Sequence, residues 1–149
     1  MKDIKKFCEN ELELYLKEIE GADIDHVSVR ITQSWLNQTN PQENQPLHYH
    51  LNSYLSGVLY IKCLPNDNIN FHNRMYGLFN NIDLRKKNTI WNREKNRIGV
   101  KEGDLIIFPS WMTHFVDTNE TDKERFTLAF NTFPTGEMGD YVEITQLKI

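Results

Sequence analysis

The sequence predicts a mainly β fold, a sandwich or barrel preceded by one helix. The first twenty residues carry apolar side chains at helical spacing, whereas most later segments alternate in hydropathy or form short apolar runs between turn residues. A length of 149 residues, with 39% hydrophobic and 26% charged residues, suits one globular domain that buries a core. We therefore expect a single domain over residues 1–149.

The N-terminal segment is expected to be an amphipathic helix. Apolar side chains recur from Ile4 to Ile19, and Gly21 follows where a helix would end. The Glu and Lys residues between them are unlike a signal peptide, and no apolar run reaches the roughly 18 residues that a membrane span needs. We expect a soluble, cytoplasmic protein without membrane contact.

The remaining chain is expected to form strands. Residues 25–38 alternate, which predicts that Val27, Ile31 and Trp35 share one face. Residues 73–96 show no clear pattern, and a long irregular excursion of this kind, with Tyr76, Phe79 and Trp91, predicts a lid. Further strands are expected at 55–63, 68–73, 97–109 (two strands around a Gly-Asp turn), 113–117, 125–134 and 140–147.

Charge and cysteine content exclude several classes of protein. A formal net charge of −4 provides no general attraction to nucleic acid or to anionic membranes. The basic cluster from Arg85 to Arg97 is expected to be a solvated loop, with substrate steering as the alternative. Cys8 and Cys63 lack paired spacing, so neither a disulfide framework nor a zinc knuckle is indicated, which suits a reducing compartment.

Three histidines are candidate metal ligands. His48 and His50 precede an apolar strand, and residues two apart in a strand point the same way, so both rings can enter a barrel. His114 follows a Pro-Ser-Trp corner at the start of another strand. Imidazole is the commonest protein ligand for iron, copper and zinc. We expect a metal site at His48, His50 and His114; the alternative is that these residues only cap or pack.

Arg125 opens a strand whose two faces both look enclosed. A buried guanidinium without an anionic partner costs several kcal/mol, and the sequence places no acidic residue obviously beside it. Because the guanidinium fork matches a carboxylate, a bound dicarboxylate is expected to pair with Arg125. The alternative is an arginine on an edge strand facing water.

The order of these motifs resembles the 2-oxoglutarate/Fe(II)-dependent oxygenases. The resemblance is closer to a subgroup found in tailed phages and marine bacteria, and it covers residues 28–134. The matching residues are Ser34, Trp35, Asn37, His48, His50, Ser53, Ser56, Gly57, Val58, Tyr60, Gly103, Phe108, Pro109, Ser110, Trp111, His114, Arg125, Thr127, Phe130 and Asn131.

The resemblance implies a double-stranded β-helix, a cupin-like jelly-roll barrel, that binds Fe(II) and 2-oxoglutarate. It implies hydroxylation of an unknown substrate, coupled to decarboxylation of 2-oxoglutarate to succinate. By the resemblance, His48 and His114 bind the metal, and Arg125 binds the distal carboxylate of 2-oxoglutarate. The other residues assigned to cofactor binding are Thr127, Tyr60 and Asn131.

His50 departs from the wider superfamily, which has a carboxylate two residues after the first histidine. All-histidine iron sites occur in the related cupins, so His50 is expected to complete the metal site. In an alternative alignment of the motif, His50 is the first ligand and Asn52 the second.

Two other functions remain open from the sequence. One is a cupin-type metalloprotein that uses the three histidines without 2-oxoglutarate, although the glutamate expected after the cupin His-x-His pair is missing. The other is a non-catalytic jelly roll that binds sugar or a virion partner. The substrate is open among a protein side chain, a nucleotide and a small metabolite. A homodimer through the N-terminal helix is also considered, and a phage-encoded protein would act in the host cytoplasm.

Overall fold

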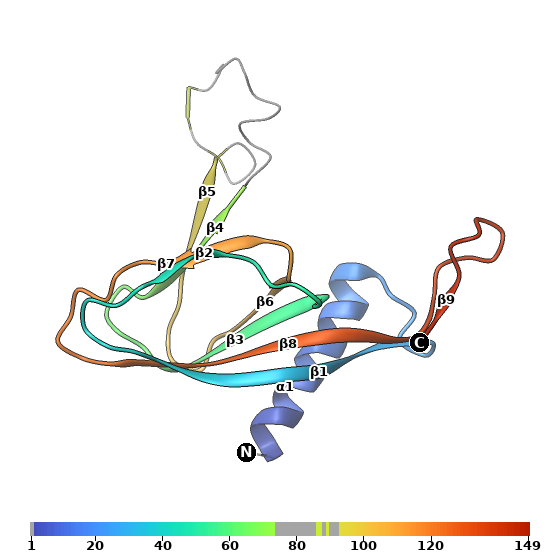
Figure 1. Ribbon diagram of the computed structural model, residues 1–149, viewed down its shortest axis with the longest axis horizontal. Helices are drawn as coiled ribbons and strands as arrows, with labels where there is room; N and C mark the ends of the chain where they lie inside the picture. Colours follow the sequence, from blue (N-terminus) through green and yellow to red (C-terminus); the bar gives the residue numbers. More distant parts are fainter. Residues whose placement is uncertain (1, 74–85, 88, 90–92) are drawn as a thin grey trace.

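The computed structural model describes residues 2–73, 86, 87, 89 and 93–149 (Figure 1). Two antiparallel sheets face one another, and one helix covers the outer face of the larger sheet. This arrangement confirms the mainly β, jelly-roll fold class with one N-terminal helix. No helix among the described residues is long and apolar enough to cross a membrane.

The larger sheet has the strand order β1-β8-β3-β6, and β9 pairs with the far end of β8. The smaller sheet has the order β2-β7-β4-β5. The strands of the larger sheet are β1 (Val27–Thr39), β8 (Arg125–Met138), β3 (Leu55–Lys62), β6 (Leu105–Pro109) and β9 (Leu147–Lys148). Those of the smaller sheet are β2 (Gln45–His48), β7 (Thr113–Val116), β4 (Asn68–His72) and β5 (Lys95–Gly99).

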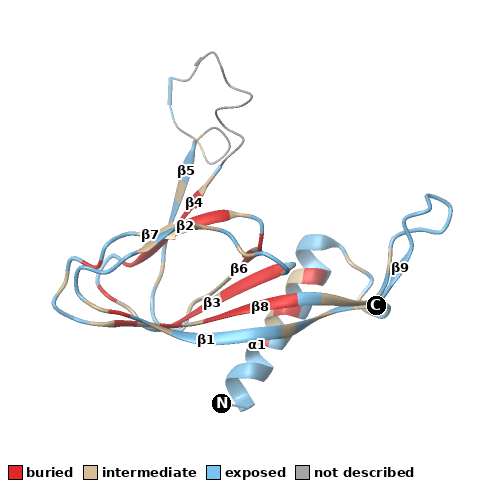
Figure 2. Ribbon diagram, in the orientation of Figure 1, coloured by how far each residue is buried: buried red, intermediate tan, exposed pale blue. Residues whose placement is uncertain are grey.

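The predicted N-terminal helix is confirmed as α1 (Lys2–Tyr15), which continues as the π-helical turn η1 (Leu16–Glu20). Gly21 ends it in the left-handed conformation, with φ of 64°. The helix buries Cys8, Leu12 and Leu16 against the outer face of the larger sheet. Figure 2 shows buried residues on the side of α1 that faces this sheet.

The two faces of β3 and β8 carry different side chains. Leu55 and Phe130 point outward and pack against α1. Phe130 crosses β3 at Gly57, where a Cβ atom would overlap its ring, so the position requires glycine. Between the sheets, Ile69 and Phe71 of β4 pack against Phe108 of β6. The inner face therefore combines an apolar cluster with the site described below.

The alternation predicted for residues 25–38 is wrong beyond Ile31. The pairing of β1 with β8 shifts register between Ile31 and Gln33, which is a β-bulge. An extra residue inverts which side chains face each way. Consequently Ile31 packs with the α1 cluster outside the sheet, whereas Trp35 lines the cavity inside.

Two other segments depart from expectation. The strand predicted over 140–147 is wrong except at Leu147, because positive φ angles at Gly139 and Ile144 reverse the chain. The exposed fractions of Tyr141 and Ile144 are 82% and 92%, so no packed sheet covers this segment. Most of the lid predicted over 73–96, including Tyr76, Phe79 and Trp91, lies outside the described residues.

Candidate metal centre and cavity

Three histidine rings converge between the two sheets. His48 and His114 are register partners on β2 and β7, and their ring centroids are 4.2 Å apart. The centroid of His50 lies 5.2 Å from that of His48 and 5.1 Å from that of His114. One ring nitrogen of each histidine lies within 4.8 Å of the other two, so the three could hold one metal ion.

His50 does not reach the other two histidines in the way that the sequence predicts, which was by alternation along one strand with His48. His48 is the last residue of β2, so His50 lies beyond the strand instead of two positions along it. The backbone N–H of His50 donates to the carbonyl of Ser110 at 3.0 Å, which holds this segment beside the corner that leads into β7. His50 therefore reaches the site through a loop contact and not through strand alternation.

Each ring is held by a hydrogen bond at Nδ1. The Nδ1 atoms of His48 and His114 lie 2.7 Å and 2.9 Å from the carbonyl oxygens of Pro46 and Met112. The Nδ1 atom of His50 lies 2.7 Å from Asn131 Oδ1. Carbonyl and amide oxygens only accept, so each Nδ1 carries the proton and each Nε2 has a free lone pair. This tautomer is the one that metal-binding histidines adopt when Nε2 is the ligand.

The site favours neutral imidazoles. Burial lowers the pKa of His114 to about 4, with further lowering from His48 and His50. Burial also lowers the pKa of His50, against the opposing hydrogen bond to Asn131. A metal binds the neutral ring, so protons compete weakly for these ligands at neutral pH. Three nitrogen donors of this kind fit Fe(II) and other first-row transition metals.

The histidines form one end of a small cavity between the sheets, with a volume of about 80 Å³. Tyr60 and Thr127, which are register partners on β3 and β8, line its wall, as does Arg125. Burial raises the pKa of Tyr60, so its hydroxyl keeps the proton and can donate. The other lining residues are Trp35, Asn37, Thr39, Gln45, Val58, Ile69, Val116 and Ala129.

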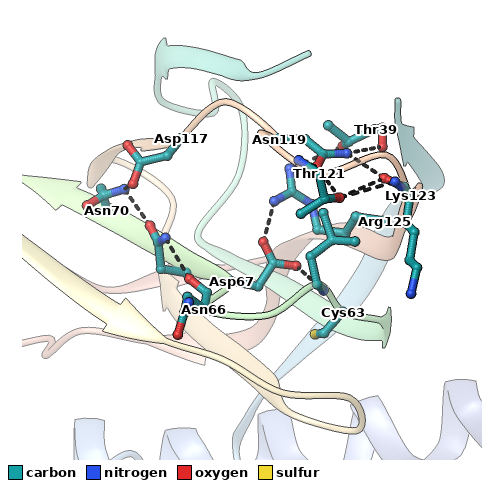
Figure 3. Close-up of polar contacts among 12 residues, drawn as sticks. Thr39, Cys63, Asn66, Asp67, Asn70, Asp117, Asn119, Thr121, Lys123 and Arg125 are labelled. Atoms are coloured by element: carbon teal, nitrogen blue, oxygen red, sulfur yellow. Dashed lines mark hydrogen bonds and ion pairs between the residues drawn. The ribbon is translucent and has the colours of Figure 1, made fainter. Parts of the chain in front are cut away.

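Arg125 is buried, but the expectation that no acidic residue is beside it is wrong. Its Nη1 donates to Asp67 Oδ1 at 2.6 Å, and its Nη2 donates to Thr39 Oγ1 at 3.2 Å (Figure 3). Asp67 is held in turn by the backbone N–H of Leu64, 3.0 Å from its Oδ2. The partner lies 58 residues away in the sequence, just before β4, so strand pattern could not reveal it.

Neither Asn131, predicted to bind the cofactor, nor Asn52, the alternative metal ligand, lines the cavity. Asn131 is buried and lies behind His50, where its Oδ1 accepts from Nδ1, and it is not among the residues that line the cavity. Asn52 lies in the exposed turn after His50, with φ of 54°, and is also outside the cavity lining.

The other two histidines lie apart from this site. His26 is exposed and its Nδ1 bonds Asp23 Oδ2 at 2.8 Å. His72 pairs through Nε2 with Glu94 Oε1 at 3.0 Å. Ser53, Ser56 and Ser110 surround His50 with buried or half-buried hydroxyl groups. These serines belong to the family pattern found in the sequence, in which no role was expected for them.

Comparison with known proteins identifies the family. Residues 33–131 match the model of the family described as "Putative 2OG-Fe(II) oxygenase". No curated protein matches the chain. Enzymes of the matched family take Fe(II) and 2-oxoglutarate as cofactors, and the three histidines could bind the metal.

Solved structures share the fold. An oxidoreductase of the 2OG-Fe(II) oxygenase family from Burkholderia pseudomallei is 14% identical, with a TM-score of 0.59 over 80% of this chain and 50% of that one. AviO1 from Streptomyces viridochromogenes Tue57 is 16% identical, with a TM-score of 0.51 over 70% of this chain and 51% of that one. The chain thus spans about half the length of these structures.

The family match covers the β1–β8 core that carries the histidines and the arginine, and the similar structures have the same fold. The chain therefore belongs to the 2OG-Fe(II) oxygenase family.

Proposed function

We propose that this protein is a Fe(II)- and 2-oxoglutarate-dependent oxygenase that hydroxylates its substrate while 2-oxoglutarate is decarboxylated to succinate. The observation that carries the proposal is the convergence of the three histidine rings, each with one ring nitrogen within 4.8 Å of the others, in the wall of a cavity that Arg125 also lines. The family match is consistent with this activity.

His48, His50 and His114 would hold the metal through Nε2. When bound, Fe(II) together with 2-oxoglutarate supplies the oxidising chemistry that activates O₂ for attack on a C–H bond. Burial lowers the pKa of His50 and His114, and the Nδ1 hydrogen bonds orient all three rings. The same hydrogen bonds fix the orientation of the rings, which lowers the cost of ordering the site.

Arg125, Tyr60 and Thr127 would bind the distal carboxylate of 2-oxoglutarate. The bonds to Asp67 and Thr39 use two of the five guanidinium N–H donors. The protonated hydroxyl of Tyr60 and that of Thr127 supply further donors on the same wall. Asp67 holds the guanidinium in place and balances its charge, so buried Arg125 does not require the ligand for stability.

The apolar part of the wall would restrict water. Val58, Ile69 and Ala129 line the cavity beside the polar groups. A dry pocket strengthens the hydrogen bonds made by Arg125 and Tyr60 and limits side reactions. Asn131 is better placed to orient His50 than to contact 2-oxoglutarate.

A second candidate is a cupin-type metalloprotein that works without 2-oxoglutarate. Two observations favour it: all three candidate ligands are histidines, and Arg125 already has a carboxylate partner in Asp67. From the sequence we also expect that the protein belongs to the subgroup found in tailed phages and marine bacteria. A cytoplasmic location and a homodimer are expected on the same basis.

One experiment separates these functions. Purified protein is incubated with Fe(II), 2-oxoglutarate and O₂, and succinate is measured, while anaerobic equilibrium dialysis gives metal and 2-oxoglutarate binding. We expect bound metal, bound 2-oxoglutarate and succinate, all lost in His114→Ala. Metal binding without 2-oxoglutarate binding would favour the cupin-type candidate. A protein that binds neither would be a non-catalytic jelly roll.

A further inference from the structure

The Nδ1 atom of His50 has two side-chain oxygens as neighbours. Ser56 Oγ and Asn131 Oδ1 each lie 2.7 Å away, and the two oxygens are 2.9 Å apart. Ser56 is fully buried, and Asn131 has an exposed fraction of 7%. Both come from the larger sheet, on the register pair between β3 and β8. The Nδ1 side of the His50 ring is therefore held by two side chains of the larger sheet, one on β3 and one on β8.

Two more serines extend this contact away from the site. Ser110 Oγ lies 2.7 Å from Ser56 Oγ and 2.7 Å from Ser53 Oγ. Ser53 Oγ in turn donates to the carbonyl of Leu55 at 3.1 Å. We call Ser53, Ser56, Ser110 and Asn131 the hydroxyl–amide network. It links the loop of His50 to β3 and the turn before it, to the corner before β7, and to β8.

The hydrogens of the network run in a direction set by Asn131. Its Oδ1 carries no hydrogen, so the contact with His50 requires a proton on Nδ1. Since Nδ1 holds a proton, Ser56 Oγ must accept from it, and the hydroxyl hydrogen of Ser56 goes to Asn131 Oδ1, which can only accept. Nε2 of His50 is then the nitrogen with a lone pair to offer a metal.

This support is specific to His50. His48 and His114 each donate Nδ1–H to a single backbone carbonyl. All three candidate ligands are histidines, so among the described residues the group contains no carboxylate to offset the charge of a divalent ion. Linked hydrogen bonds polarise one another, and an Nδ1–H shared between two acceptors makes Nε2 a stronger donor.

We propose that the hydroxyl–amide network positions His50 and strengthens it as a metal ligand, so that a neutral histidine serves in a site without a carboxylate. Ser56 and Asn131 act directly on His50, whereas Ser110 and Ser53 hold Ser56. The inference rests on the proposed metal site, and the members of the network are positioning residues that do not touch the metal.

The test measures metal affinity of the full chain by anaerobic titration with Fe(II) and, separately, with Co(II), whose visible absorption reports the ligand field. Ser56→Ala and Asn131→Leu are expected to weaken binding by about 10-fold or more and to shift the Co(II) bands. Asn131→Asp keeps an oxygen acceptor at Nδ1 and is expected to retain the affinity that Asn131→Leu loses.

Thr132→Val is the matched control. Thr132 is fully buried like Ser56, and within the described part of the chain its hydroxyl bonds only the backbone of Leu55, at 2.9 Å and 3.1 Å. This variant also loses a buried hydroxyl but should bind metal within about twofold of the original protein. Thermal unfolding of every variant reports whether it folds.

The outcomes separate the inference from the proposed function. If the original protein binds neither Fe(II) nor Co(II), the proposed metal site itself fails. If it binds metal while Ser56→Ala and Asn131→Leu match Thr132→Val in affinity and Co(II) spectrum, the network does not act on His50 and the inference is overturned. The inference would also be overturned if Asn131→Asp lost as much metal affinity as Asn131→Leu. An oxygen acceptor at Nδ1 of His50 would then have no effect on metal binding.

Discussion

We expect Arg125 to serve both the stability of the fold and the proposed binding of 2-oxoglutarate. Its guanidinium is buried with Asp67 in an ion pair of 2.6 Å, and both side chains are at most 6% exposed. Removing one member of such a pair leaves an uncompensated buried charge, which costs about 3–5 kcal/mol. A simple alanine substitution would therefore confuse lost binding with lost stability.

A double variant resolves this difficulty. Arg125→Ala is expected to lower the free energy of unfolding by about 3–5 kcal/mol and to raise the 2-oxoglutarate concentration for half-saturation at least 10-fold. Adding Asp67→Asn should recover much of the stability but none of the 2-oxoglutarate binding, with Fe(II) affinity nearly unchanged. Urea unfolding and anaerobic titration measure the two effects. Recovery of 2-oxoglutarate binding in the double variant would show that Arg125 is only structural.

The free energy of unfolding is expected to depend on pH through His114. Burial lowers its pKa to about 4, from the ordinary value of 6.5. Between these values the unfolded chain binds a proton that the metal-free folded protein does not, so the free energy of unfolding falls as pH falls through this window. The contribution of His114 is about 3 kcal/mol.

Urea unfolding of the metal-free protein at pH 7 and pH 4 measures this change. His114→Asn should lose less stability over the same interval, because asparagine does not titrate. His26→Asn is a control for histidine removal at an exposed position. An identical pH dependence in His114→Asn and the original protein would assign the whole effect to other groups.

At the scale of elements, the contact between β3 and β8 sets a steric requirement. Gly57 lies under the Phe130 ring, and an added Cβ would overlap it. Gly57→Ala should therefore destabilise the protein by about 1–3 kcal/mol through displacement of Phe130 from the α1 cluster. At Gly99 of β5 no atom lies within 4 Å of an added Cβ, so Gly99→Ala should cost much less.

Chemical denaturation of both glycine variants measures the difference. Phe130→Leu in the Gly57→Ala background should restore part of the loss, because the smaller side chain vacates the space that the methyl group needs. Equal stability of Gly57→Ala and Gly99→Ala would mean that the sheet accommodates the methyl group without strain.

At the scale of the whole molecule, the metal would join segments that are distant in the chain. His48 ends β2 and His50 follows it, whereas His114 lies on β7, and Ser56 and Asn131 behind His50 belong to the other sheet. A ligand that binds only the folded state stabilises it by about 2.7 kcal/mol at 100 times its dissociation constant. Metal should therefore raise the melting temperature of the entire fold.

Scanning calorimetry under anaerobic conditions, with and without Fe(II), measures this shift. His114→Ala should melt at the same temperature in both conditions, and His26→Ala should respond as the original protein does. A shift in the original protein that persists in His114→Ala would place the metal elsewhere.

Sequence pattern by itself determined the elements and the chemistry of the candidate site. Spacing identified α1, most strands, the three histidines and the inward direction of Arg125, because periodic burial and residue type are local properties of the chain. Local pattern gave wrong predictions in two places. The bulge after Ile31 turned Trp35 toward the inside of the sheet, and positive φ angles prevented a strand over most of 140–147.

Only the tertiary structure decided how those groups are partnered. The Asp67 carboxylate beside Arg125, the loop contact that turns His50 inward, and the serines behind His50 all come from positions far apart in the sequence. Such pairs depend on how the two sheets and their connecting loops pack, and residue periodicity carries no information about that packing. The candidate ligands can therefore be predicted from the sequence, whereas the groups that orient and balance them require the folded chain.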